Sequence, residues 1–267
     1  MPNERILYAC QEITPYLAES QISTICRNLP QQMQVAGNEI RLFTPKYGNI
    51  NERRNQLHEV IRLSGMNIII DDNDHQLILK VASIPGARLQ VYFIDNDDFF
   101  HRKALVRSDE GEFFEDNDER AIFFARGVLE TVKKLRWSPS IIHCHGWMSA
   151  IIPALLKRCY KSDPIFKDVK IVISLYDDMF EESLNENLVA KLKLEGLKAN
   201  ELETLETSDY RSLMKFALQF ASGVVKVTEN LDPEIEEYIT SNQIPTLIHP
   251  NQENYSSAYD QFYETLN

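Results

Sequence analysis

Glycine is scarce in this chain, which has 9 glycines among its 267 residues. That share is about half of the roughly 7% found in average proteins. The glycines are also dispersed, so the sequence contains no Gly-Gly pair, no Gly-x-Gly-x-x-Gly fingerprint and no P-loop. Because glycine lets backbone amides approach a phosphate without an intervening Cβ atom, the sequence excludes a nucleotide site built on a glycine-rich loop.

Long apolar runs and an excess of basic residues are also absent. No apolar run approaches the roughly 20 residues of a membrane helix, and the N-terminus lacks the long apolar region of a secretion leader. The net charge is −12 and no basic patch offsets it, so the phosphate backbone of a nucleic acid would be repelled. We therefore expect neither a nucleic acid nor a membrane as a partner.

Cysteine is sparse and carries no metal-binding or disulfide pattern. Cys10, Cys26, Cys144 and Cys159 form no Cys-x-x-Cys pair, and each lies in an apolar periodic segment. This usage predicts reduced thiols in the core of a cytoplasmic protein. The glycosylation sequon at 254–256 is then interpreted as a chance match.

The chain does contain an alternation of short apolar runs and helical stretches. This alternation predicts an α/β fold with a doubly wound, mostly parallel sheet. Residues 58–95 are instead rich in β-forming runs and turns, which predicts a small antiparallel extension. Strands are expected at 5–11, 39–44, 140–146, 169–177, 223–229 and 246–250, and helices at 21–36, 118–136, 147–160, 208–221 and after Pro233.

Two segments fall outside this alternation. Residues 178–206 are polar and rich in Glu and Leu, and we expect a mobile insertion of one or two helices there. Residues 251–267 are expected to be a polar, loosely docked tail. The predicted domain therefore spans residues 1–250.

Polar and aromatic residues follow four of the predicted strands. These segments are Gln11-Glu12, 143–147, 176–178 and 228–230. Ligands of open parallel sheets bind at the carboxyl ends of the strands. The sequence therefore predicts a pocket where these four segments converge.

Several side chains near this pocket have a structural as well as a chemical interpretation. His143 and His145 alternate along a strand and could chelate zinc, but no third ligand is spaced to help, so one core and one rim histidine are expected. Cys144 lies in a buried strand, which disfavours a nucleophile. No metal ion or cofactor is predicted.

Acidic and aromatic residues before the second long helix also have two interpretations. The acids at 115, 116, 118 and 119 resemble paired catalytic carboxylates, but at a helix start they are expected to be caps that meet the helix dipole. Phe99, Phe100, Phe113 and Phe114 could stack on sugar rings or on a partner protein. We expect them to anchor an irregular loop onto the core.

Several motifs, in order along the chain, resemble the N-terminal half of bacterial glycogen synthase and plant starch synthase. Residues 6–16 resemble the opening strand and the Glu-x-x-Pro-Phe loop, and 38–48 resemble the second strand and its Pro-x-Tyr-Gly turn. Residues 116–120 resemble the Asp-Asn-x-Glu-Arg helix start, and 143–147 the His-x-His-Asp-Trp strand. Residues 221–235 resemble the strand that closes the domain. The resemblance implies a Rossmann-like domain of the two-domain GT-B type, in enzymes that transfer glucose from ADP-glucose.

The chain departs from this family at residues tied to the chemistry. The Lys-x-Gly-Gly loop is replaced by Ala18, Ser20 and Gln21, and Gly146 replaces an aspartate. Tyr176 stands where the family has a histidine that lines the donor-sugar site. The second GT-B domain, which grips most of the nucleotide, is expected to be absent. The resemblance leaves a candidate pocket of Glu12, Tyr16, Asn117, Glu119, Arg120, His145, Trp147, Tyr176 and Asp177.

Three functional hypotheses remain open at this level. The first is a degenerate, non-catalytic glycogen/starch synthase homologue that binds an α-glucan or an active glycosyltransferase chain. The second is a working ADP-glucose glucosyltransferase, acting alone or with a separate chain that supplies the second domain. The third is an unrelated role for the same fold, such as binding a small metabolite.

Overall fold

One sheet organises residues 4–205 and 207–266, the part of the chain that this computed structural model describes. Its strand order is β10-β9-β8-β7-β1-β2-β6-β5-β3, and β4 pairs with β5 off this path. The strands are β1 (Arg5–Cys10), β2 (Glu39–Pro45), β3 (His58–Glu59), β4 (Met66–Ile70), β5 (Asn73–Ser83), β6 (Gln90–Asp95), β7 (Ile141–His145), β8 (Lys170–Leu175), β9 (Gly223–Lys226) and β10 (Thr246–Ile248).

The sheet is parallel from β10 to β6 and antiparallel beyond. Strand β5 runs antiparallel to β6, β3 and β4. The central strands β7 and β8 are rich in Ile and Val and buried along almost their whole length, as expected for a sheet that is covered on both faces. The predicted doubly wound, mostly parallel α/β fold with a small β-rich extension is confirmed.

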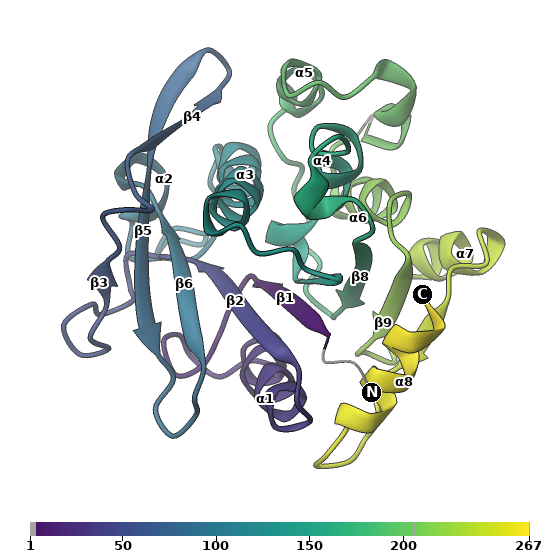
Figure 1. The fold of residues 1–267 in the computed structure, drawn as a ribbon. Coiled ribbons are helices and arrows are strands. Elements are labelled where there is room, and N and C mark those ends of the chain that lie inside the picture. The colour runs from purple at the N-terminus through teal and green to yellow at the C-terminus, as the bar shows by residue number, and fades with distance from the viewer. Residues whose placement is uncertain (1–3, 206, 267) are drawn as a thin grey trace.

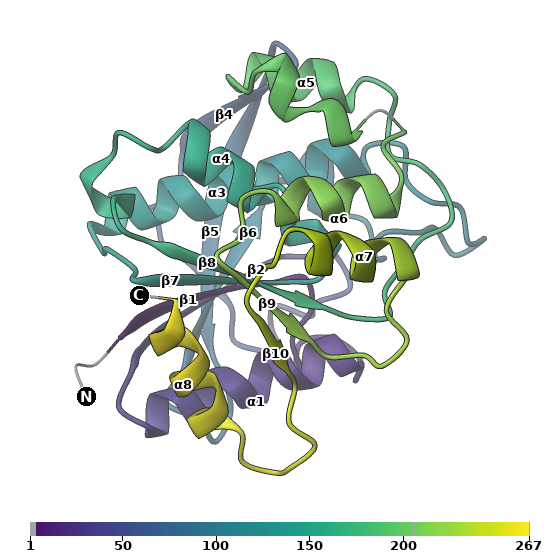
Figure 2. The same ribbon diagram turned by 90° about the vertical axis from the view of Figure 1, so that its right-hand side faces the viewer.

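Helices cover the two faces of the sheet unequally. Helices α1 and α8 lie on one face, and α3, α4, α6 and α7 lie on the other (Figures 1 and 2). The helices are α1 (Gln21–Val35), α2 (Asp97–Phe100), α3 (Asn117–Leu135), α4 (Ile152–Arg158), α5 (Leu188–Leu194), α6 (Tyr210–Leu218), α7 (Pro233–Ser241) and α8 (Ser256–Thr265), with 3-10 turns at Trp147–Ser149, Pro164–Phe166, Ala199–Glu201 and Glu203–Leu205. Within the described ranges, no helix is long and apolar enough to cross a membrane.

The chain reverses its direction across the sheet at β1. From β1 it proceeds through α1 to β2 and then to β6, and it later returns to add β7 on the other side of β1. The carboxyl ends of β1 and β7 therefore flank the topological switch point, where ligands bind in open α/β sheets. This is also where the sequence places Glu12 and His145.

The expected mobile insertion is ordered and packed. Residues 178–205 contain α5 and two 3-10 turns, and residue 206 of the expected insertion lies outside the described residues. Their leucines are buried at a helical spacing, which the sequence interpretation overlooked because the intervening residues are charged. The buried leucines are Leu184, Leu188, Leu192, Leu197, Leu202 and Leu205.

The expected loose tail is also wrong, because residues 256–265 form α8. Tyr259, Phe262 and Tyr263 are buried on its inner face. The helix packs so closely on the sheet that a Cβ atom at Gly223 would lie 2.8 Å from the Phe262 ring. Asn38 donates from Nδ2 to Asp260 (3.2 Å), which ties α8 to the end of α1.

The loop aromatics and cysteines follow the expectations only in part. Phe99 and Phe100 are buried in the core, as expected, and Phe113 and Phe114 are partly buried. Three of the four cysteines are buried, but Cys159 is exposed at the end of α4. The core assignment is therefore wrong for Cys159, which is the C-cap residue of α4.

Candidate functional site

Three of the four predicted strand ends converge at the switch point. The Gln11 backbone N–H donates to the carbonyl of His145 (2.9 Å), and the Gln11 side chain accepts from the Met148 N–H (3.1 Å). The Trp147 N–H donates to Asp178 Oδ2 (3.3 Å). The ends of β1, β7 and β8 are thus joined by hydrogen bonds.

The fourth strand end lines a hollow beside the start of α1. Thr228 and Glu229 line a hollow of about 600 Å³ together with Gln21 of α1, Lys226 of β9 and His249 after β10. No residue of the candidate pocket lines this hollow. The prediction that all four strand ends line one pocket stays a prediction. Gln21 Nε2 donates to the Val227 carbonyl (3.4 Å), so the end of β9 lies beside the start of α1.

The start of α1 is closed by side chains where the resembling family has glycines. The Ser23 N–H donates to Ser20 Oγ (3.0 Å), and the Ser20 N–H donates to Ser23 Oγ (2.8 Å), which forms a capping box. Ser20 Oγ also donates to Glu12 Oε2 (2.8 Å). A capping side chain and a carboxylate thus occupy the helix start, which otherwise attracts anions.

The residue after the His-x-His segment is restricted to glycine. Gly146 has φ +80°, and a Cβ atom added there would lie 2.7 Å from the Cβ of Gln11. A non-glycine residue is strained at that φ even where space is available. The structure therefore has no room at this position for the aspartate of the family motif.

The two histidines of β7 are both in the core. His143 and His145 have no exposed surface, so the expectation of one core and one rim histidine is wrong. A His143 ring nitrogen, Nδ1, bonds to the Tyr263 hydroxyl (2.7 Å), and Nε2 bonds to Ser174 Oγ (2.8 Å). Helix α8 supplies Tyr263, which encloses His143.

His145 is held in the same cluster by Tyr176. Its Nδ1 lies 2.7 Å from the Tyr176 hydroxyl, and its ring lies 4.1 Å from that of His143. Burial lowers the pKa of His145 to about 3, with a further contribution from His249. Burial also lowers the pKa of His143 well below its usual value. Both imidazoles are therefore neutral at physiological pH.

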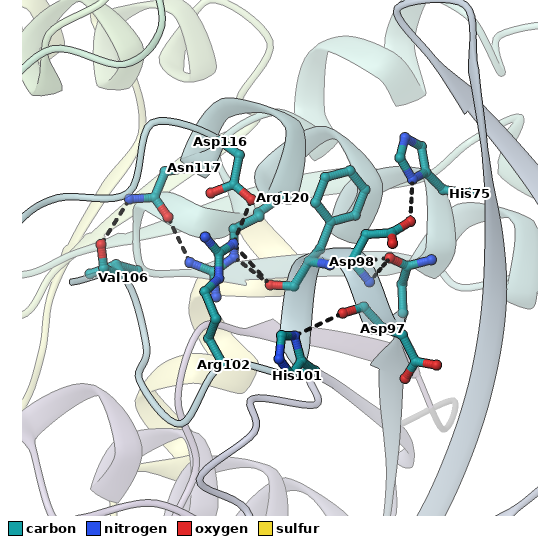
Figure 3. A network of polar contacts seen from close by, with 11 residues as sticks. His75, Asp97, Asp98, His101, Arg102, Val106, Asp116, Asn117 and Arg120 are labelled. Atoms are coloured by element: carbon teal, nitrogen blue, oxygen red, sulfur yellow. Dashed lines mark hydrogen bonds and ion pairs between the residues drawn. The ribbon is translucent and has the colours of Figure 1, made fainter. Parts of the chain in front are cut away.

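A second polar cluster lies at the start of α3 and retains its charge (Figure 3). Arg120 has no exposed surface; its Nε donates to the Phe99 carbonyl (2.9 Å) and its Nη1 to Asn117 Oδ1 (2.7 Å). No carboxylate pairs with it in the described part of the chain. Instead, the rings of Tyr47, Phe100 and Phe114 lie within cation–π distance of its guanidinium.

Neighbouring side chains extend this arginine cluster. Arg102 pairs with Asp116 and also stacks over Phe114, 4.2 Å from the ring centroid. Burial lowers the pKa of Arg120 to about 10, and Arg102 adds to this effect. Two guanidinium groups and one carboxylate leave the cluster with a net positive charge.

The acids at the start of α3 form ion pairs. Asp116, at the N-cap position, makes no side-chain capping bond. Lys191 of α5 lies 2.7 Å from Asp118 and 2.6 Å from Glu119. The expected capping bond is therefore absent at Asp116, whereas Asp118 and Glu119 lie in the first turn of α3, where they meet the helix dipole as expected. The cations that pair with these acids come from the inserted segment and the 101–116 loop.

The remaining candidate residues differ in their access to solvent. Trp147 is buried between Phe113 and Phe180, and the ring of Tyr16 lies edge-on to Phe93 (4.9 Å). Asp177 is exposed, and Glu12 is partly exposed. Burial raises the pKa of Asp178, hydrogen bonds from Tyr210 and Trp147 oppose the rise, and nearby Glu12 adds to it.

Sequence reasoning missed Arg102, Lys191 and Tyr263 as members of these clusters. Only Tyr263 carried a local signal, because the aromatic residues at 255, 259, 262 and 263 have a helical spacing. Across residues 4–205 and 207–266, no group of three or more His, Cys, Asp or Glu side chains is arranged to hold a metal ion.

Comparisons with known proteins agree with this architecture. The family described as starch synthase catalytic domain matches residues 5–249. A glycogen synthase of Chlorobium limicola is 35% identical over 212 residues, which cover 76% of this chain and 43% of that protein. A glycogen synthase of Pelodictyon phaeoclathratiforme is 36% identical over 176 residues, which cover 66% of this chain and 36% of that protein.

A solved structure shows the same fold at lower sequence identity. The catalytic domain of starch synthase IV from Arabidopsis thaliana, bound to ADP and acarbose, matches with a TM-score of 0.72 and 18% identity. The match covers 92% of this chain and 51% of that chain. The fold and site thus define a Rossmann-like domain of the GT-B glycosyltransferase class. This chain belongs to the starch synthase catalytic domain family, and it spans less than half the length of the glycogen synthases that it matches.

Proposed function

We propose that this chain binds α-glucan and does not by itself transfer glucose from ADP-glucose. The observation that carries the proposal is the closed start of α1, where Ser20 caps the helix and bonds to the Glu12 carboxylate. A departing diphosphate needs positive charge or free amide donors, and this stabilisation is usually the largest catalytic term. Here the Ser20 side chain accepts a hydrogen bond from an amide at the helix start, and the Glu12 carboxylate lies against Ser20.

The buried histidine cluster supports the same proposal. A general acid or base is most effective when its pKa lies near the working pH. Burial lowers the pKa of His145 to about 3, and Tyr176 bonds its Nδ1. His145 is thus closed to proton exchange with a ligand at neutral pH.

An aromatic face beside the switch point supports the glucan part of the proposal. Phe113 is partly exposed and stacks on Phe180 at 5.0 Å with an interplanar angle of 25°. Asp177 and Met179 on the adjoining loop are exposed, and Glu12 is partly exposed. Apolar ring faces beside carboxylates suit a sugar, which offers both C–H faces and hydroxyl groups.

Affinity electrophoresis in gels that contain glycogen tests this function. We expect the chain to be retarded by glycogen and titration calorimetry to detect a maltooligosaccharide more strongly than ADP-glucose. Phe113→Ala should lose most of the retardation. Tyr238→Ala, which changes a partly buried aromatic residue of α7, is the matched control and should keep the retardation. Absence of glucan binding, or tight binding of ADP-glucose alone, would contradict the proposal.

A second candidate is a glucosyltransferase half that works with a separate chain. The arginine cluster favours it, because Arg102 and Arg120 retain a net positive charge beside the switch point. Its test mixes this chain with the remainder of the Chlorobium limicola glycogen synthase, expressed separately, and measures glucosyl transfer. Transfer by the mixture and by neither part alone would favour this candidate over the first.

A further inference from the structure

The far edge of the sheet has no partner strand. Strand β4 pairs with β5 along one side, and β3 borders the same side of β5. Within the described ranges, no strand pairs with the opposite side of β4. The hairpin of β4 and β5 projects from one side of the molecule, next to α2 and α3 (Figure 1). Unpaired strand edges present backbone donors and acceptors that can pair with another chain.

This edge lacks the features that normally prevent such pairing. Proteins protect edge strands with charged residues, proline or bulges, but β4 reads Met-Asn-Ile-Ile-Ile. Ile68 and Ile70 are buried, and the strand packs against α3. Ile69 is 57% exposed and Ile61, in the turn before β4, is 82% exposed. Pairing along β4 would cover apolar surface that is now in water.

Charges at the two ends of β4 make the edge complementary to itself. Arg62 is exposed before the strand. After it, Asp71 and Asp72 form the hairpin turn with φ values of 47° and 62°, as in a type I′ turn, which holds the two strands in a fixed register. If two such edges run antiparallel about Ile68, Asp71 and Asp72 at the tip of each copy lie opposite Gly65 and Ser64 of the other, two residues from Arg62.

We propose that a second copy of this chain pairs with β4 in an antiparallel, two-fold symmetric dimer. Residues opposite each other across a strand pair share a face. A register centred on Ile68 therefore keeps Ile68 and Ile70 on the α3 side and sets Ile69 of each copy opposite Asn67 of the other. The same patch serves both copies, as in the commonest class of homodimer. Because the strand has five residues, the interface is small and the dimer dissociates at low protein concentration.

Sedimentation velocity of the full chain over a micromolar to submillimolar range tests this interface. We expect a concentration-dependent dimer. Ile69→Lys places a charge on the exposed face and should weaken dimerisation by about tenfold or more. Leu194→Lys is the matched control, because Leu194 is 64% exposed on α5; it should leave dimerisation unchanged. A monomer at every concentration, or a dimer that Ile69→Lys does not weaken, would overturn the proposal.

The salt dependence of dimerisation is a second test, because its sign should differ between the wild type and the variant Arg62→Glu. Attraction between Arg62 and the acidic turn is screened by salt, so added salt should weaken the wild-type dimer. Arg62→Glu replaces attraction by repulsion, so its dimer should be weaker at low salt and should gain stability as salt is added. An identical salt dependence of the two proteins would contradict the proposed antiparallel arrangement.

Discussion

The histidine cluster of β7 and the arginine cluster at the start of α3 are both buried, yet they differ in charge. His143 and His145 are neutral and bond to Tyr263, Ser174 and Tyr176. Arg120 is equally buried and stays charged, because a guanidinium does not lose its proton near neutral pH. It is held by carbonyl oxygens and aromatic rings instead of a carboxylate.

The difference shows that buried residues of the shared motifs can be either neutral or charged. Both clusters are built on segments that match the glycogen synthase family. Helix α8 and Tyr176 seal the histidines, whereas the 101–116 loop and α5 bring Arg102 and Lys191 to the acids of α3. Surrounding segments decide which partners each cluster has, and the residue type decides whether the buried group keeps its charge.

The test with the largest expected effect removes the cation that pairs with the acids at the start of α3. Lys191→Met leaves the fully buried Asp118 without its partner. Breaking a buried ion pair by removing one partner costs about 3–5 kcal/mol. We expect a loss of that size in the free energy of unfolding, measured with urea. Lys193→Met, on the exposed face of the same helix, should change stability by less than about 0.5 kcal/mol. Equal effects of the two variants would contradict an ordered α5.

The next test asks whether His145 is neutral in the folded chain. The pKa of His145 is about 3 in the folded chain and about 6.5 when unfolded. Between these values the unfolded state binds a proton that the folded state does not, so stability falls as pH falls below about 6.5. His145 should thus account for about 2 kcal/mol of the stability lost between about pH 7 and pH 5.

The variant His145→Asn isolates this contribution. We expect its unfolding free energy to fall by about 2 kcal/mol less than that of the wild type over the same pH interval. His58→Asn is the control, because His58 is exposed on β3 and lies in water in both states. If His145→Asn and the wild type show the same pH dependence, His145 is accessible to protons in the folded chain.

The smallest expected effect concerns the start of α1. Ser20→Ala removes the capping bond to Ser23 and the bond to Glu12, and loss of a cap costs about 1 kcal/mol. Ser20→Gly should cost only a few tenths of a kcal/mol. Thermal unfolding of the two variants measures this difference. A Ser20→Ala variant as stable as the wild type would show that the cap does not close this helix start.

Much of the fold was readable from sequence because its signals are local. The alternation of apolar strands and amphipathic helices gave the parallel sheet, and the turn-rich run at 58–95 gave the antiparallel extension. Residues 178–206 and 251–267 were misjudged because their average polarity masks apolar residues at helical spacing. The type of a secondary-structure element follows from the spacing of its apolar residues, and the average composition of a segment does not show that spacing.

The site was less readable because its contacts are distant in sequence. The pairing of His143 with Tyr263 spans 120 residues, and that of Lys191 with Asp118 spans 73. No local pattern identifies such partners. The motifs located the strand ends correctly, but the partners of the two histidines come from α8 and from Tyr176 after β8, and the partners of the α3 acids come from α5 and the 101–116 loop.

Glucosyl transfer by the purified chain is the most direct test of the proposed loss of catalysis. The chain is incubated with ADP-glucose and a maltooligosaccharide, and products are identified by mass beside an active glycogen synthase. The closed start of α1 and the neutral, buried His145 predict no extension of the oligosaccharide. Extension by the chain alone would contradict this account, because it would require a charge-stabilising site that these two clusters do not provide.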